Sequence, residues 1–242
     1  MKRTYRQNCA LALSSDILGE RWTLLIIREL LIQPCRFKDL NSVLVGMGTN
    51  LLTNRLKELE AFGLIERQTK DDKRSPYQLS PRGLEVEPIV LAMIRWGRGQ
   101  LVEVKVGEDE FTHQDHWDLL AMKALFNPEQ FQSKQITSIT LVFNTEDFTG
   151  WIKASREGLK YKVGTDSDSN IDEVDEVDEV DEVDEVDEVD EVDEVDGIKN
   201  VVIELPMTIA QLQQVLAENG EARKKLLAEN SYLENLVNCF LV

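Results

Sequence analysis

Four polar side chains between residues 50 and 57 have a spacing that places them on one face of a helix. They are Asn50, Thr53, Asn54 and Lys57, at positions i, i+3, i+4 and i+7. The leucines of the same segment fall on the opposite stripe, at Leu52, Leu56 and Leu59. Amide side chains can bond adenine edges in a DNA major groove, and lysine and hydroxyl groups suit phosphates. The alternative is an ordinary amphipathic surface helix. The elements predicted on either side of this segment distinguish the two interpretations.

Three helices are predicted to position this face. The first spans residues 17–31 behind capping residues 14–16, and its apolar groups lie almost all round, which implies burial in a core or a subunit contact. The second spans residues 36–44. The third spans residues 49–62, begins with a threonine that can cap it, and ends at Gly63, a natural left-handed residue.

A hairpin and a fourth helix follow. Residues 64–69 and 77–80 are predicted strands around a charged turn at 70–76. Ser80 and Pro81 then supply a helix cap and a first helical residue. The apolar stripe of that helix comprises Val86, Ile89, Val90, Met93 and Trp96, and the helix is predicted to end at Gly97 and Gly99. Three helices, a hairpin and a helix make the order of a winged helix-turn-helix.

Particular segments resemble the HxlR-type family of bacterial winged-helix transcription regulators over roughly residues 5–100. They are Asp-Ile-Leu-Gly-Glu-Arg-Trp-Thr-Leu-Leu at 16–25, Arg-Phe-Lys-Asp-Leu at 36–40, Leu-Thr-Asn-Arg-Leu-Lys-Glu-Leu-Glu at 52–60, Gly-Leu-Ile-Glu-Arg at 63–67, Tyr-Gln-Leu-Ser-Pro-Arg-Gly at 77–83 and Trp96-Gly97. The resemblance implies a cytoplasmic, nucleoid-associated homodimer with paired recognition helices. It also implies a cysteine ahead of the first long helix, here Cys9, that can serve as a thiol switch.

The function predicted from these features is sequence-specific binding of double-stranded DNA. Asn50, Thr53 and Asn54 are the candidates for base edges, and Arg55 and Lys57 for phosphates or bases. The wing would follow the adjacent backbone or minor groove. The complete predicted DNA-binding set is Arg36, Lys38, Thr49, Asn50, Thr53, Asn54, Arg55, Lys57, Lys70, Lys73 and Arg74. The first helix and the 86–96 stripe would form core and dimer contacts.

Charge is divided unevenly along the chain, whose formal net charge is −18. Residues 1–106 carry 17 Lys and Arg against 12 Asp and Glu, whereas residues 107–242 carry 10 against 33. Residues 172–196 alone hold 17 of those acids and no base. The predicted DNA-binding region is therefore basic.

The acidic run contains eight Asp-Glu-Val triplets from Asp172 to Val195. Its three-residue period matches neither helix nor strand, and its charge density prevents collapse, which favours a disordered insert. The alternative is an acidic decoy that competes with DNA for the basic face.

The C-terminal part is predicted to be an α+β domain, residues 107–242, behind a winged-helix domain of residues 1–106. Its predicted elements are helices at 116–126, 207–216 and 222–240 and strands at 136–143, 159–163 and 201–205. The pattern resembles the sterol-carrier-protein-like domains, which implies an apolar effector. The rival function is a winged-helix module that binds protein and is fused to a lipid carrier.

Catalytic and metal chemistry have little support in the sequence. No serine, cysteine or phosphate-loop constellation is present, which predicts no enzyme activity and no cofactor. Three widely spaced cysteines do not make a disulfide framework, no apolar leader is evident, and residues 166–177 lack the glycine and glutamate of a calcium loop. His113 and His116, with Asp115 and Asp118, could hold a metal at helical spacing, but a solvated helix start is the preferred interpretation. Cys9 is either a packing residue or a redox-sensing thiol.

Overall fold

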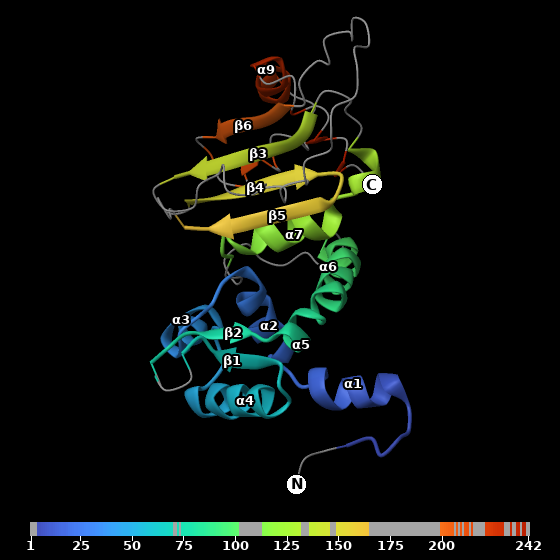
Figure 1. The fold of residues 1–242 in the computed structure, drawn as a ribbon, viewed down its shortest axis with the longest axis vertical. Coiled ribbons are helices and arrows are strands. Elements are labelled where there is room, and N and C mark those ends of the chain that lie inside the picture. Colours follow the sequence, from blue (N-terminus) through green and yellow to red (C-terminus); the bar gives the residue numbers. More distant parts are fainter. Residues whose placement is uncertain are drawn as a thin grey trace, which may run out of the picture.

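The computed structural model describes residues 4–69, 72, 74–101, 113–131, 136–145, 149–164 and 199–205. Toward the C-terminus it describes 207, 209, 211, 212, 214, 221–229, 233, 236, 237, 239 and 240. Two hydrophobic cores organise these residues, one under the N-terminal helices and one under a four-stranded sheet (Figure 1).

The N-terminal half has the predicted helix and hairpin order. Its elements are α1 (Ala10–Leu18), α2 (Thr23–Ile32), α3 (Phe37–Val43), α4 (Thr49–Ala61), β1 (Ile65–Arg67), β2 (Tyr77–Leu79), α5 (Pro81–Leu84) and α6 (Glu87–Leu101). β1 and β2 are antiparallel, with Ile65 opposite Leu79. The leucine stripe of α4 is fully buried in this core. The structure thus confirms a winged helix-turn-helix arrangement.

The prediction of one continuous helix over residues 17–31 was wrong. The chain forms α1 and α2 with a turn between them, and residues 14–16 lie inside α1 instead of capping a helix. Trp22 has a left-handed conformation (φ 79°), which a continuing right-handed helix cannot contain. Asp16 instead accepts hydrogen bonds from Thr4 Oγ1 (2.6 Å) and Tyr5 N (3.0 Å).

Glycine is required at two positions, one after α4 and one within α5. Gly63 has φ 68° directly after the helix, as predicted. Gly83 packs so closely on the backbone that an added Cβ would lie 1.9 Å from Leu64 O. The Thr49 cap was not found, since the N-cap residue of α4 is Gly48.

The predicted helix after Ser80 is two helices, α5 and α6. Ser80 Oγ does accept a bond from Gly83 N (3.0 Å), and Pro81 is the first helical residue, as predicted. The glycines did not end α6, which continues to Leu101. Glycine in a helix interior costs only about 1 kcal/mol relative to alanine, so two glycines lower helix stability without necessarily ending the helix. α6 contacts α2 and α7.

The C-terminal half is built on a mixed sheet. Its elements are α7 (Trp117–Leu125), a short 3-10 helix (Pro128–Gln130), β3 (Ile136–Asn144), β4 (Thr149–Ser155), β5 (Gly158–Val163), β6 (Lys199–Leu205) and α9 (Glu221–Glu229). The strand order is β5-β4-β3-β6, with β3 and β6 parallel and the other pairs antiparallel. The three predicted strands are present, and β4 was missed. The predicted helix over 222–240 corresponds at its start to α9, which begins at Glu221 and ends at Glu229, and residues 233, 236 and 237 are also helical. Only parts of 207–216 are described.

One face of this sheet, the inner face, forms the second core. It comprises Ile139, Leu141, Phe143, Ile152, Ala154 and Leu159, with Ile203 and Leu205 from β6. α7 packs on it through Leu119 and Leu120, and in Figure 1 α7 lies between the sheet and α2. Leu31 of α2 and Ile94 of α6 pack against both cores. The N-terminal and C-terminal halves are therefore held together by packed side chains as well as by the polypeptide backbone. Among the described helices, none is long and apolar enough to cross a membrane.

Candidate nucleic-acid interface

Three of the four residues on the polar face of α4 are exposed. Asn50, Asn54 and Lys57 are exposed, whereas Leu52 and Leu56 on the opposite stripe are buried. The half-buried Thr53 donates its hydroxyl to Thr49 O (2.8 Å) and keeps its oxygen lone pairs as acceptors. A helix held by a leucine stripe can present amides and an ammonium group to a groove without losing core packing.

Arg55 differs from its neighbours on α4. Its side chain is only 11% exposed, and its guanidinium forms ion pairs with Glu58 Oε2 (2.6 Å) and Glu20 Oε2 (3.3 Å). Glu20 lies in the turn before α2, so Arg55 ties α4 to that turn. The structure gives Arg55 a positioning role, and a DNA contact would require it to leave these partners.

Exposed cations lie on two further elements of the winged helix. Arg36 and Lys38, at the start of α3, are exposed, and so is Arg74 in the hairpin turn. Lys70 and Lys73 lie outside the described residues. Arg67 holds the base of the wing, because it stacks over the Tyr77 ring (4.2 Å) and donates to Ser75 O (3.0 Å).

Exposed apolar side chains lie on α6 and on α1. On α6, Ile89, Met93 and Trp96 are exposed, Trp96 by 71%, and they line a groove with Pro88 and Ala92. On α1, Leu11 is 75% exposed. The predicted 86–96 stripe is thus divided, because Val86 and Val90 enter the core and the other three side chains do not.

Cys9 precedes α1 and is exposed, unlike the buried Cys35 and Cys239. Hydrogen bonds from the backbone N–H groups of Ala12 and Leu11 lower the pKa of its thiol. A lower pKa increases the thiolate fraction, which is the reactive form of cysteine. The buried packing role for Cys9 is therefore wrong, and the redox role stays a prediction.

The sequence did not indicate the joint between the two halves, which is centred on Glu29 of α2. Glu29 is 2% exposed and accepts bonds from His116 Nε2 (2.9 Å) and Trp117 Nε1 (2.8 Å) while pairing with Arg28. The Arg28 guanidinium stacks on the Trp117 ring (3.8 Å). Burial opposes ionisation of Glu29, but the bond from His116 and the charge of Arg28 outweigh it and lower the Glu29 pKa. The sequence did contain one indication of this contact: Glu29 is an acid within an otherwise apolar helix, and a buried carboxylate requires a partner.

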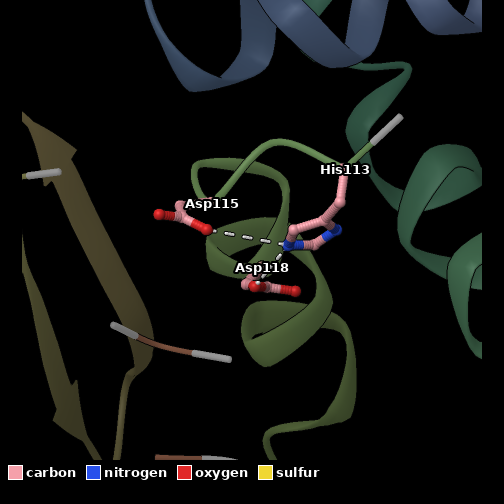
Figure 2. Close-up of side chains that lie close together, drawn as sticks. All are labelled: His113, Asp115 and Asp118. Atoms are coloured by element: carbon pink, nitrogen blue, oxygen red, sulfur yellow. Dashed lines mark hydrogen bonds and ion pairs between the residues drawn. The ribbon is translucent and has the colours of Figure 1, made fainter. Parts of the chain in front are cut away.

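The histidines do not form the helical pair considered from the sequence. α7 begins at Trp117, so His113 and His116 precede it, and His116 bonds to Glu29 instead of being solvated. Figure 2 shows His113 with Asp115 and Asp118: its Nε2 is 3.1 Å from Asp118 Oδ2 and 3.9 Å from Asp115 Oδ1. One atom from each side chain lies within 4.8 Å of the others. Three such groups suit a divalent cation, but the same distances also describe a hydrogen-bonded cluster, and we assign no metal.

Desolvation raises the pKa of Asp118, and the nearby charge of His113 opposes that rise. Asp118 lies at the start of α7, far from α4 in the sequence. The His113 cluster therefore contributes nothing to the polar face described above.

Comparisons with known proteins match the winged-helix part. The family model described as HxlR-like helix-turn-helix matches residues 17–105. The HTH-type transcriptional regulator YvaP of Bacillus subtilis is 34% identical over 83 residues, which are 34% of this chain and 77% of that protein. The HTH-type transcriptional regulator sll1512 of Synechocystis is 37% identical over 84 residues, and the match spans only 62% of its length.

A similar solved structure is the reduced form of the transcriptional regulator YodB from B. subtilis. It is 31% identical, and the match covers 38% of this chain and 92% of that one, with a TM-score of 0.33. The family match ends before the sheet. The resemblance of residues 107–242 to sterol-carrier-like domains therefore has no support from these comparisons.

Proposed function

This chain belongs to the HxlR-like helix-turn-helix family, and on that premise we propose that it is a dimeric, sequence-specific DNA-binding transcription regulator. The observation that carries the proposal is the polar face of α4, with Asn50, Asn54 and Lys57 exposed above a buried leucine stripe.

In the proposed complex, α4 enters a major groove. Asn50 and Asn54 lie one helical turn apart, so both amides can reach base edges on neighbouring pairs. Lys57, Arg36 and Lys38 would contact phosphates on either side, and the wing with Lys70, Lys73 and Arg74 would follow the adjacent backbone. Thr49 and Thr53 complete the set, whereas Arg55 would act by holding α4 against the turn before α2.

The proposed domains are residues 1–106 and 107–242, in keeping with the two cores. We propose that the exposed apolar side chains of α1 and α6 form the dimer contact, because Leu11, Met93 and Trp96 have no apolar cover in the single chain. A two-fold dimer would read an inverted repeat with half-sites about 10–10.5 base pairs apart, or a multiple of that spacing.

Control of DNA binding would come through Cys9 or through the C-terminal half. A reactive thiol at α1 adjoins the proposed dimer surface, so its oxidation would change subunit contacts. An apolar ligand of residues 107–242 would act through the Glu29 joint, since α7 reaches α2 there. Neither input involves a catalytic step.

The test is selection of bound genomic fragments followed by affinity measurement on the selected site. An Asn50→Ala/Asn54→Ala variant should lose sequence preference while retaining salt-dependent non-specific binding. A Glu85→Ala variant, at an exposed position after α5, is the matched control. Unchanged site affinity in the folded double variant would overturn the assignment of α4, and failure to bind any fragment would favour the protein-binding alternative.

The dimer is tested separately by sedimentation. Trp96→Glu/Met93→Glu should shift the mass from dimer to monomer at micromolar concentration, because two charges would be buried in an apolar contact. A wild-type chain that is monomeric at the same concentration would contradict the dimer without affecting the fold.

A further inference from the structure

The segment that leads into α7 brings one nitrogen donor and two carboxylates together. Distances alone do not distinguish a metal site from a hydrogen-bonded cluster at His113, Asp115 and Asp118, but the number of hydrogen bonds that the imidazole can form does. His113 Nε2 carries at most one hydrogen. It lies 3.1 Å from Asp118 Oδ2 but 3.9 Å from Asp115 Oδ1, which is beyond hydrogen-bond range. Hydrogen bonding therefore accounts for one of the two carboxylates, whereas a metal ion would use both.

The backbone of this segment holds the three groups on one side. Trp117 N donates to Gln114 O (2.9 Å) and Asp118 N donates to Asp115 O (3.1 Å), so the segment forms a tight turn. The two aspartates are three residues apart on this turn, and Figure 2 shows both carboxylates converging on the imidazole. The ring of Trp117 meets the His113 ring edge-on, with centroids 6.1 Å apart, which restricts the orientation of the imidazole.

The charge of the cluster favours a cation. The side chain of Asp118 is 13% exposed and that of Asp115 is 29% exposed. Within the described part of the chain, His113 is the only side chain that bonds or pairs with either carboxylate. Arg98 of α6 adds one positive charge near Asp118, so two carboxylates and one arginine leave the cluster negative when the imidazole is neutral. The N-terminus of α7 can stabilise one carboxylate, but it gives no reason for an imidazole nitrogen at the same point.

The donor set indicates the class of ion. Zn²⁺ binds imidazole nitrogen and carboxylate oxygen at about 2.0–2.2 Å in a tetrahedral arrangement, which places neighbouring ligand atoms about 3.3 Å apart. In this cluster one atom from each side chain lies within 4.8 Å of the others, so small side-chain rotations would bring them to that spacing. Ca²⁺ prefers about six to eight oxygen ligands, and Mg²⁺ prefers octahedral oxygen ligands. One imidazole with two carboxylates suits neither of them.

We propose that His113, Asp115 and Asp118 bind a divalent cation with the ligand preference of Zn²⁺, with water at the fourth position. The site adjoins the joint between the halves, because Trp117 contacts His113 and also donates to Glu29 of α2. A bound ion fixes the start of α7 and thereby strengthens its contact with α2. Metal binding does not require DNA binding. If the proposed function holds as well, this cation is a further input that reaches the winged helix through the joint.

The direct test is protection of His113 from diethyl pyrocarbonate, which modifies uncoordinated imidazole, measured by mass spectrometry of peptides from the full chain. A Cys9→Ser background removes the exposed thiol, which can also bind Zn²⁺. Zn²⁺ in excess over the chain should slow the modification of His113 several-fold, and Mg²⁺ at the same concentration should not. His116 is the internal reference, because it is bonded to Glu29 and its rate should stay unchanged. Equal rates for His113 with and without Zn²⁺ would overturn the proposal.

The carboxylates are tested by Asp115→Asn/Asp118→Asn, which keeps the side-chain shapes and removes both charges. Protection of His113 by Zn²⁺ should be lost in this variant. Glu157→Gln, which changes an exposed acid in the turn between β4 and β5, is the matched control and should keep it. Protection that persists in the double variant would contradict the site.

A second measurement is the unfolding temperature. Zn²⁺ should raise it in the Cys9→Ser chain and in the Glu157→Gln control, because a ligand that binds only the folded state stabilises that state. The folded Asp115→Asn/Asp118→Asn variant should show no increase, and an increase equal to that of the control would contradict the site. Neither readout involves DNA, so a negative result leaves the proposed function standing.

Discussion

α4 and the β4–β5 pair each combine a polar face with an apolar one, but they differ in what positions the polar groups. On α4 one segment supplies everything: Asn50, Asn54 and Lys57 on one side and leucines on the other. On the sheet, Lys153 and Lys160 meet only because two strands pair in a particular register. The helical face is a property of local sequence, whereas the lysine pair exists only after the sheet has formed.

The two regions also differ in how they are held to the rest of the molecule. α4 is fixed within one core, while the sheet reaches the winged helix through α7 and the buried Glu29. The difference predicts that the joint, instead of either surface, controls whether the halves behave as one unit.

The largest effect is expected from removing Glu29. Glu29→Ala leaves His116 and Arg28 without their buried partner, which typically costs about 3–5 kcal/mol. Urea unfolding should show this loss, and Glu85→Ala should stay within about 0.5 kcal/mol of wild type. An unfolding free energy equal to wild type for Glu29→Ala would mean that the halves do not depend on the joint.

A matched pair of core cavities compares the halves directly. Leu56→Ala in the first core and Leu141→Ala in the second, each 1% exposed in the parent, should cost about 2–5 kcal/mol. Because the halves share packing at Leu31 and Ile94, calorimetry should record a single transition for both variants. Two separated transitions would show that the halves unfold independently.

Smaller, local effects are expected on α4. Asn54→Ala should cost about 1–3 kcal/mol at the selected site and relax specificity there. Lys57→Ala should weaken binding to all sequences similarly and reduce the salt slope by roughly one contact. If the two variants showed the same loss of specificity, the division into base and phosphate contacts would be wrong.

The smallest effect is the pH dependence of the joint. The Glu29 pKa is lowered on folding, so its contribution is present above the unfolded pKa of about 4.3 and is lost as pH falls through the folded value. Glu29→Gln should therefore flatten the acid side of the stability profile. If the stability of Glu29→Gln fell with decreasing pH as steeply as that of the wild type, other carboxylates would be responsible for acid unfolding.

The winged helix was predictable for physical reasons that act within short segments. A leucine stripe, a glycine after the helix and a serine-proline cap each act through neighbours a few residues away, and α4, Gly63 and Ser80 match these expectations. The break at Trp22 was missed because its left-handed conformation has no marker in a tryptophan. β4 was missed because its inner positions include Gly150 and Ala154, which carry little hydrophobic signal.

The sequence by itself determined the polar face of α4 and the charge division of the chain, since both depend on residue type and local spacing. Only the tertiary structure decided that Arg55 is held in ion pairs, that Glu29 joins the halves, and that Lys153 and Lys160 share one face of a sheet. Each of these depends on groups from separate elements meeting in space. A helical period is fixed by the backbone, whereas the partner of a buried charge is fixed by how the elements pack.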